Sequence, residues 1–348
     1  TPVEIRQIPP RRLEALRHNR LDDWFYGCHF IGDPVMPGCW GVDAVWQCLK
    51  FFAAWRGLAG CDKTLGMENV SFFGQIRPYD TKINYVVEIL SLERQEGQAM
   101  ITGKAAVSVD GVPVYSIGSA QVATDFWEND NASLAHPTPP PAACGAALTR
   151  RLSYDEFAAR SAFNQAEVIA ISLGSLIEKA PVEVGLLPSS MMLEIGQVDQ
   201  IAYNSATGEG SIRASKRNSP LDWFYPMSPG LKPAALSIDA VWQLLGLFLT
   251  WRQNAGTGRA LGFERVEVFD TVRPSDASLT YELKISRLSR SESSGDAFVR
   301  ADAQVLADGR LILACANANV GCHNNIRYSD YPLMSDMAFG GKLKPKQA

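Results

Sequence analysis

The chain has 348 residues, of which 46% are hydrophobic and 20% are charged, and its formal net charge is −4 at pH 7. This length accommodates about two domains of ordinary size, each with a core of its own. The slight excess of acidic residues gives no electrostatic support for binding nucleic acid or an anionic membrane.

The seven cysteines are an odd number without a CxxC pair. This pattern favours reduced thiols in a cytoplasmic protein over a disulfide framework. The N-terminal residues also lack the basic and apolar regions of a secretory signal. We therefore predict a cytoplasmic protein.

The most apolar run of the first half is Cys39–Trp55. It is shorter than the roughly 20 residues of a membrane span and contains Asp43, Gln47 and Lys50, so membrane insertion is not expected. An apolar helix of this kind is typical of a protein core. Apolar alternation then predicts four strands. They lie near Val70–Ile76, Ile83–Leu92, Ala99–Val109 and Val114–Thr124.

A stretch rich in Pro and Ala, residues 132–149, predicts an extended linker. After it, Ser153 is a candidate helix N-cap with Glu156 three residues later, the spacing of a capping box. A second apolar helix is predicted at Ala235–Trp251. Four strands follow it, near Val266–Phe269, Ser278–Ile285, Ala297–Leu306 and Arg310–Val320.

The two halves repeat each other. "DWFY" occurs at Asp23 and at Asp222, "DAVWQ" occurs at Asp43 and at Asp239, and the second motif repeats at an offset of 196 residues. We predict two copies, residues 1–131 and 150–330, followed by a tail at 331–348. A long buried helix with several antiparallel strands in each copy predicts an α+β fold in which a sheet wraps around a helix.

The copies differ before "DWFY". Only 22 residues precede the motif in the first copy, whereas about 70 separate the linker from the second. We therefore expect the first copy to lack its N-terminal helix and opening strands, and we interpret this as truncation of a larger polypeptide.

The stretch "GCHFIGDPVMPGCWGVDAVWQ" combines groups suited to acid–base chemistry. His29 lies in a loop just before the first helix, and Pro37 and Gly38 mark the helix start. The amides of Gly38 and Cys39 are then donors at a positive helix end, a site for a carbonyl oxygen that acquires negative charge. A histidine beside such donors can remove a proton α to that carbonyl.

An acid for the same reaction is available on the helices. Asp43 and Asp239 lie inside apolar segments, where loss of solvation raises the pKa of a carboxyl group. Gln47 and Gln243 follow them at i+4 and can hydrogen-bond to them. A lone histidine is more often structural than catalytic. Cys28, His29 and Cys39 have no fourth ligand at a usual zinc spacing, so no metal is predicted.

The longer stretch "WFYGCHFIGDPVMPGCWGVDAVWQ" resembles the active-site segment of bacterial β-hydroxyacyl-acyl carrier protein dehydratases. The closer match is to the class that also isomerises trans-2 to cis-3 decenoyl thioesters. The second copy resembles the same family from "LSYDEF" to "GRLILACANANVG". The resemblance implies a hot-dog fold, no metal or redox cofactor, and a 3-hydroxyacyl substrate carried on the phosphopantetheine of acyl carrier protein.

The resemblance also implies roles for individual residues. His29 matches the catalytic base, Asp43 and Asp239 match the helix-borne acid, and Gly38 matches the oxyanion glycine. An aspartate, where the non-isomerising class usually has glutamate, modestly favours the isomerising class. Our remaining candidates for positions that contact the oxyanion or the substrate are Cys39, Val35 and Gln243.

In this family two hot dogs pair, and each site takes its histidine from one subunit and its acid from the other. The chain then resembles a fused pair, a double hot-dog with a pseudo-twofold axis. We predict one working site, His29 with Asp239, and one vestigial site with Asp43, Gln47 and Ser228. Such a one-sided pair is similar to dehydratase domains of polyunsaturated fatty acid or polyketide synthases. The chain is then predicted to be a monomer whose two halves imitate a dimer, and other synthase domains are its predicted partners.

Two alternatives stay open at the level of sequence. One is a hot-dog acyl thioesterase, which needs an acid poised to activate water. The other is a non-catalytic module that binds an acyl carrier. Whichever of these functions the protein has, Lys284, Arg287 and Arg290 on the second copy offer a basic surface to an acidic carrier.

Overall fold

The computed structural model describes residues 3–8, 11–58, 61–95, 98–125, 150–179, 184–228 and 230–324. The predicted linker at 132–149 and the predicted tail at 331–348 lie outside these ranges. The elements of the first half are β1 (Val3–Ile8), β2 (Arg12–His18), η1 (Trp24–Gly27), α1 (Gly38–Trp55), β3 (Cys61–Phe72), β4 (Lys82–Gln95), β5 (Gln98–Val109) and β6 (Val112–Asp125).

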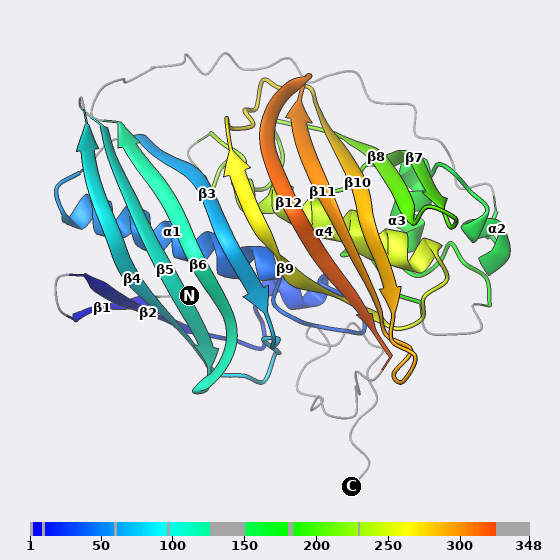
Figure 1. Ribbon diagram of the computed structural model, residues 1–348, viewed down its shortest axis with the longest axis horizontal. Helices are drawn as coiled ribbons and strands as arrows, with labels where there is room; N and C mark the ends of the chain where they lie inside the picture. Colours follow the sequence, from blue (N-terminus) through cyan, green and yellow to red (C-terminus); the bar gives the residue numbers. More distant parts are fainter. Residues whose placement is uncertain are drawn as a thin grey trace, which may run out of the picture.

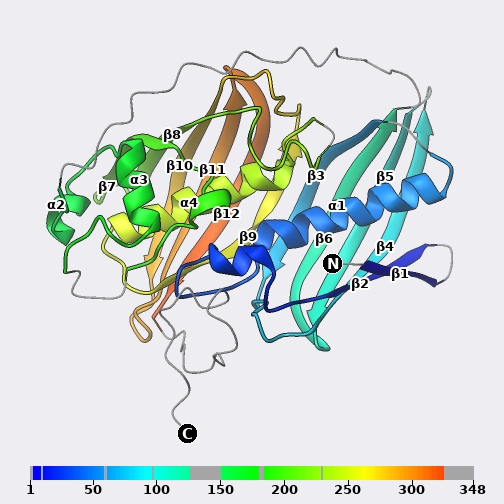
Figure 2. The same ribbon diagram turned by 180° about the vertical axis from the view of Figure 1, so that it is seen from behind.

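The elements of the second half are α2 (Tyr154–Ala158), α3 (Gln165–Ser172), η2 (Ser190–Met192), β7 (Gln197–Asn204), β8 (Glu209–Arg217), α4 (Ala234–Trp251), β9 (Thr257–Val268), β10 (Ser278–Arg290), β11 (Ala297–Ala307) and β12 (Arg310–His323). Helices α1 and α4 lie along the same face of one broad sheet (Figures 1 and 2).

The described strands form a single 12-stranded antiparallel sheet in the order β1-β2-β4-β5-β6-β3-β9-β12-β11-β10-β8-β7. Read from either edge, this order is the same in both halves, with β3 and β9 at the centre. Each half wraps its six strands around one long helix, as predicted, and the two sheets are joined edge to edge. This is a double hot-dog fold.

The prediction that the first half lacks its opening strands is wrong. Strand β2 pairs with β1 and β4 in the same way that β8 pairs with β7 and β10. The sequence before "DWFY" in the first half is short, but two strands need few residues. Within the described residues, only the second half has helices, α2 and α3, before its opening strands.

The repeat predicted the long helices well and the strands beside them poorly. Each helix begins one residue before the predicted start, at Gly38 and Ala234. The strand predicted at Val70–Ile76 is instead β3, which ends at Phe72, and the one predicted at Val266–Phe269 is β9, which ends at Val268. The capping box of Ser153 and Glu156 is confirmed, although it opens a helix of only five residues.

The junction between the halves explains the glycines that the two copies share. Strands β3 and β9 pair antiparallel, with Ser71 opposite Gly262 and Gly66 opposite Glu267. A Cβ atom on Gly66 would lie 2.4 Å from the carbonyl oxygen of Val266. A Cβ atom on Gly262, where φ is +123°, would lie 1.9 Å from the carbonyl oxygen of Val70. The backbones approach too closely for any side chain.

Replacing Gly262 with Ala is therefore expected to destabilise the protein by more than about 2 kcal/mol, because both the contact and the backbone conformation are incompatible with a side chain. Chemical denaturation measures this. Gly246→Ala on α4 is the control, since a Cβ atom there meets nothing within 4 Å. That change should be neutral or stabilising. Equal effects of the two substitutions would contradict this account of the junction.

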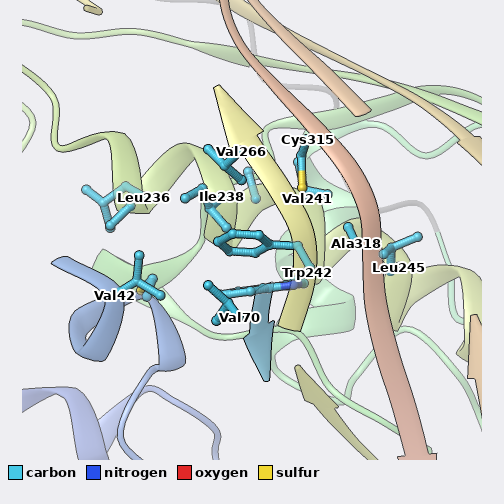
Figure 3. Close-up of a cluster of buried hydrophobic side chains, with 14 of the residues drawn as sticks. Val42, Val70, Leu236, Ile238, Val241, Trp242, Leu245, Val266, Cys315 and Ala318 are labelled. Atoms are coloured by element: carbon cyan, nitrogen blue, oxygen red, sulfur yellow. The ribbon is translucent and has the colours of Figure 1, made fainter. Parts of the chain in front are cut away.

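The main core lies where helix α4 meets the central strands. In Figure 3, Trp242 on α4 is surrounded by side chains of β9 and β12, and Val42 and Val70 reach it from the first half. The indole Nε1 of Trp242 donates to the carbonyl oxygen of Gly262 at 3.3 Å. The equivalent Trp46 donates to Gly66 at 3.0 Å. Both junction strands are thus tied to their own helix.

The two long helices differ in how far they are covered. Helix α4 is long and apolar enough, by length and composition, to cross a membrane, but 89% of its residues are buried in the protein. Residues from α2 onward cover it: Tyr154 donates to the carbonyl oxygen of Thr250, and Trp251 donates to that of Arg160. On α1, the equivalent Trp55 is 51% exposed.

Candidate active site

A narrow cavity of about 90 Å³ lies at the junction of the two halves. Its lining is mostly apolar and includes Phe72 from β3, Leu187 from the loop before η2, and Trp242 from α4. Three titratable groups also line it, His29 from the first half and Asp239 and Arg259 from the second. The structure therefore brings together the histidine and the aspartate that were predicted to share a site.

His29 is held in one tautomer by its own loop. Its Nδ1 lies 2.9 Å from the carbonyl oxygen of Val35. Since a carbonyl can only accept, Nδ1 carries the proton in the neutral ring, and Nε2 keeps its lone pair. The side chain is buried, and loss of solvation lowers the pKa of His29 to about 4. At neutral pH this imidazole is an uncharged base.

Asp239 differs from His29 because its surroundings favour the protonated form of the side chain. The side chain is buried on helix α4, and loss of solvation is the main cause that raises its pKa to about 7. Gln243 donates from Nε2 to Oδ2 of Asp239 at 2.6 Å. An oxygen that accepts this bond does not need the proton, so in the neutral acid the proton belongs on Oδ1. Asp239 is thus a carboxylic acid that is largely protonated below pH 7.

Gln243 is itself fixed by two backbone groups. Its Nε2 also donates to the carbonyl oxygen of Met192 at 2.8 Å, and its Oε1 accepts from the amide of Glu194 at 3.0 Å. With every bond of its amide directed, Gln243 holds Asp239 in place. Although Gln243 lines the cavity, its amide is engaged by Asp239 and the backbone and not turned to a ligand.

A buried ion pair lies next to this acid. Glu194 is fully buried, and its carboxylate lies 2.5 Å from the ammonium of Lys232 and 3.2 Å from that of Lys216. Burial alone would raise the pKa of Glu194, but the two ammonium groups hold it below its usual value. The resulting carboxylate also raises the pKa of Asp239. It therefore contributes to keeping the acid protonated.

The start of helix α1 completes the site. Gly38 is the first helical residue and lines the cavity, while the N-cap Pro37 makes no side-chain hydrogen bond to the helix. The first amides of α1 are therefore donors at the positive end of this 18-residue helix. Val35 also lines the cavity. Cys39 is fully buried beside Asp239, and the two share a hydrogen bond.

The cavity thus holds both a base, His29, and an acid, Asp239. Two buried titratable groups whose environments drive their pKa values apart are the pattern expected for general acid–base catalysis. Amides at the start of a helix, beside a mostly apolar cavity, suit an oxygen that gains negative charge. The site fits removal of a proton next to a carbonyl group, with protonation of a leaving group on the other side.

The chain matches the model of the FabA-like domain over residues 11–118 and 187–316, which is more than half of its length. It belongs to the FabA-like domain family.

The fold of this FabA-like chain is similar to that of two solved dehydratase domains. One comes from the CurJ module of curacin polyketide synthase, with a TM-score of 0.51 and 13% identity over 93% of this chain and 98% of that one. The other comes from a mycocerosic acid synthase-like polyketide synthase, with a TM-score of 0.50 and 13% identity over 93% and 95%. At this identity the similarity is one of fold, and it matches the predicted fused pair.

The second FabA-like half retains the backbone of the loop but not its chemistry. The amide of Ser228 donates to Phe224, as the amide of His29 donates to Phe25. Ser228 therefore occupies the position of the histidine and offers no base.

The aspartate opposite this loop is also less enclosed. Asp43 is half-buried and accepts a hydrogen bond from Gln47, as Asp239 does from Gln243. However, Gln47 is exposed, whereas Gln243 is buried and fixed by the backbone of the segment before β7. Burial raises the pKa of Asp43, but the structure does not build a matching acid–base pair around it.

Several residues at the site were not predicted from the sequence. Glu194 and Lys232 are 38 residues apart, and Asp33 and Arg259 are 226 apart, so spacing gave no indication that they would pair. One indication of a buried ion pair was visible in the sequence, namely Lys232 in the apolar loop before the second long helix. Within the described ranges, no three His, Cys, Asp or Glu residues are grouped as metal ligands would be.

Proposed function

We propose that this FabA-like protein removes water from 3-hydroxyacyl thioesters carried on acyl carrier protein and gives trans-2-enoyl thioesters. The observation that supports it most is the pairing in one cavity of a histidine that is neutral above its pKa of about 4 and an aspartic acid whose pKa is raised to about 7. A base and an acid of these kinds are what elimination from a 3-hydroxyacyl group requires.

In the proposed reaction, Nε2 of His29 removes a proton from C2 of the substrate. The negative charge that develops on the thioester oxygen is stabilised by the amide of Gly38 at the start of α1. Asp239 gives its proton to the 3-hydroxyl, the C3–O bond breaks, and water leaves. A C2=C3 double bond remains. His29 then holds one proton more and Asp239 one fewer, and exchange with water restores both.

The proposal includes the setting of the reaction. The substrate arrives on the phosphopantetheine arm of an acyl carrier protein, no metal or organic cofactor takes part, and the protein works in the cytoplasm beside other synthase domains of fatty acid or polyketide type. Lys284, Arg287 and Arg290 lie exposed on β10. They remain our prediction for a surface that meets the carrier.

Incubation with a 3-hydroxyacyl thioester tests the function, with three separate readouts. Enoyl absorbance reports dehydration, release of a free thiol reports thioesterase activity, and chromatography of the products distinguishes trans-2 from cis-3 isomers. We expect enoyl product without thiol release. A cis-3 product would add isomerase activity to the assignment. Thiol release alone would replace it, and binding without turnover would leave a carrier-binding module.

The pH dependence of kcat/KM follows from the two protonation states. His29 must be neutral, so activity should fall as the pH drops through its pKa of about 4. Asp239 must be protonated, so activity should also fall as the pH rises through its pKa of about 7. We therefore expect a plateau between these values and about a tenfold loss per unit above the upper one.

Initial rates measured across the pH range check this prediction, and Asp43→Asn is the matched control that should keep the alkaline limb. An activity that increases steadily from pH 6 to pH 9 would mean that Asp239 does not act as the acid.

A further inference from the structure

The loop that carries His29 is closed on itself. The amide of Val35 donates to the carbonyl oxygen of His29 at 2.9 Å. Phe30 and Asp33 exchange two further backbone bonds, at 2.9 and 3.1 Å. Together with the bond from the imidazole Nδ1 to Val35, these contacts make residues 29–35 one rigid unit. The ring can move only if the whole loop moves.

The second half of the chain holds the tip of this loop. Both carboxylate oxygens of Asp33 accept from the guanidinium of Arg259, at 2.6 and 2.7 Å. Arg259 lies on β9, and its remaining contacts include Gln75 at 3.0 Å and the carbonyl oxygen of Gly258 at 2.9 Å. The two paired side chains are only 13% and 5% exposed. A forked, buried pair of this kind fixes orientation as well as distance.

The forked Asp–Arg pair is not repeated in the half that lacks the histidine. At the offset of 196 residues, Arg259 corresponds to Lys63 in the first half. The loop that would face it, Pro226–Lys232, is three residues shorter than its counterpart and contains no carboxylate. The forked pair and the histidine therefore occur together in one loop and are absent together from the other.

We propose that Arg259 is a positioning residue that holds the His29 loop in register with Asp239 across the junction of the two halves. This inference rests on the proposed dehydration for its catalytic meaning, while the placement of the ring can be measured without it. The second half then supplies the site with an acid and also with the anchor for the base of the first half.

The charges around His29 make the anchor measurable. Asp33 on its own loop, Arg259 on β9 and Asp239 on α4 face the region of the ring, and Cys39 lies beside Asp239. Of the first two, the Arg259 charge lowers the pKa of His29, and the Asp33 charge raises it. Removal of one partner should therefore shift the titration of the ring in one direction, and removal of the other should shift it in the opposite direction.

The experiment combines an NMR titration of the His29 ring, assigned by its loss in His29→Asn, with kinetics on a 3-hydroxyacyl thioester. In Arg259→Gln we expect the pKa of His29 to rise, and in Asp33→Asn we expect it to fall. Arg259→Lys keeps the charge but loses the fork. It should titrate like the wild type and still lose about 100-fold in kcat, the effect of a small misplacement of a catalytic group.

Arg310→Gln is the control, because it removes another arginine of the same half, which donates from Nη2 to both carboxylate oxygens of Asp276 at 3.0 Å and from Nη1 to Asp270, away from the cavity lining. It should change neither the titration nor kcat. If Arg259→Lys keeps full activity, or if Arg310→Gln loses as much as Arg259→Gln, the positioning role is wrong. Absence of enoyl product in a wild-type protein whose variants titrate as described would instead remove the proposed function and keep the anchor.

Discussion

Asp239→Asn is expected to lower kcat/KM for dehydration by about 10³-fold, while Asp43→Asn should leave it close to the wild-type value. An asparagine is nearly the same shape as the aspartate and can still bond with Gln243, but it has no proton to give to the leaving hydroxyl. Steady-state kinetics on both variants, with thermal unfolding to confirm that each is folded, makes the comparison.

The comparison is sharp because the two aspartates are equivalent in the repeat and differ in their surroundings. Each has a glutamine one turn later, but in the part of the chain that the structure describes it is Asp239 that lines a cavity with a histidine. If Asp43→Asn lost activity and Asp239→Asn did not, the site would have to be built around the other helix. Equal losses in two folded variants would contradict the assignment of a single working site.

His29→Ala is expected to abolish measurable dehydration, a loss of at least about 10³-fold, because no second histidine lies among the described residues that line the cavity to take the C2 proton. The loss should appear in kcat, since the ring contributes little to holding a long acyl chain. His323→Gln is the control. His323 pairs with Asp296 at the end of β12, outside the cavity lining, and its replacement should leave kcat unchanged.

A different base would be revealed by this pair of variants. If His29→Ala retained more than a tenth of the wild-type rate, the proton would have to be taken by another group or by water. If His29→Ala lowered both kcat and the melting temperature, His29→Gln would distinguish a loss of catalysis from a loss of stability, because it keeps a polar side chain in the loop.

The sequence alone predicted those parts of the molecule that depend on local pattern. The repeat of "DAVWQ" predicted two equivalent helices, and the family resemblance implied the pairing of His29 with Asp239. Apolar alternation located β4, β5, β6, β10, β11 and β12. It misplaced β3 and β9, because their pairing across the junction depends on Gly66 and Gly262, whose role is visible only when two backbones lie side by side.

The charged residues around the site could not be predicted in this way. Asp33 stood in the quoted motif without a role until Arg259, 226 residues later, was found beside it. Glu194 is fully buried, which is rare for its residue type unless it is paired, and its two lysine partners come from different parts of the second half. Such pairs are set by the tertiary fold and leave no period or spacing in the chain.

The pairing of β3 with β9 determines which strand edges are open to a neighbouring molecule. Within the described strands, the only edges that a neighbouring molecule can extend are those of β1 and β7. A half produced on its own would expose β3 or β9 as an open edge, a surface prone to self-association. The two halves thus depend on each other through the backbone of β3 and β9 as well as through the cavity that they share.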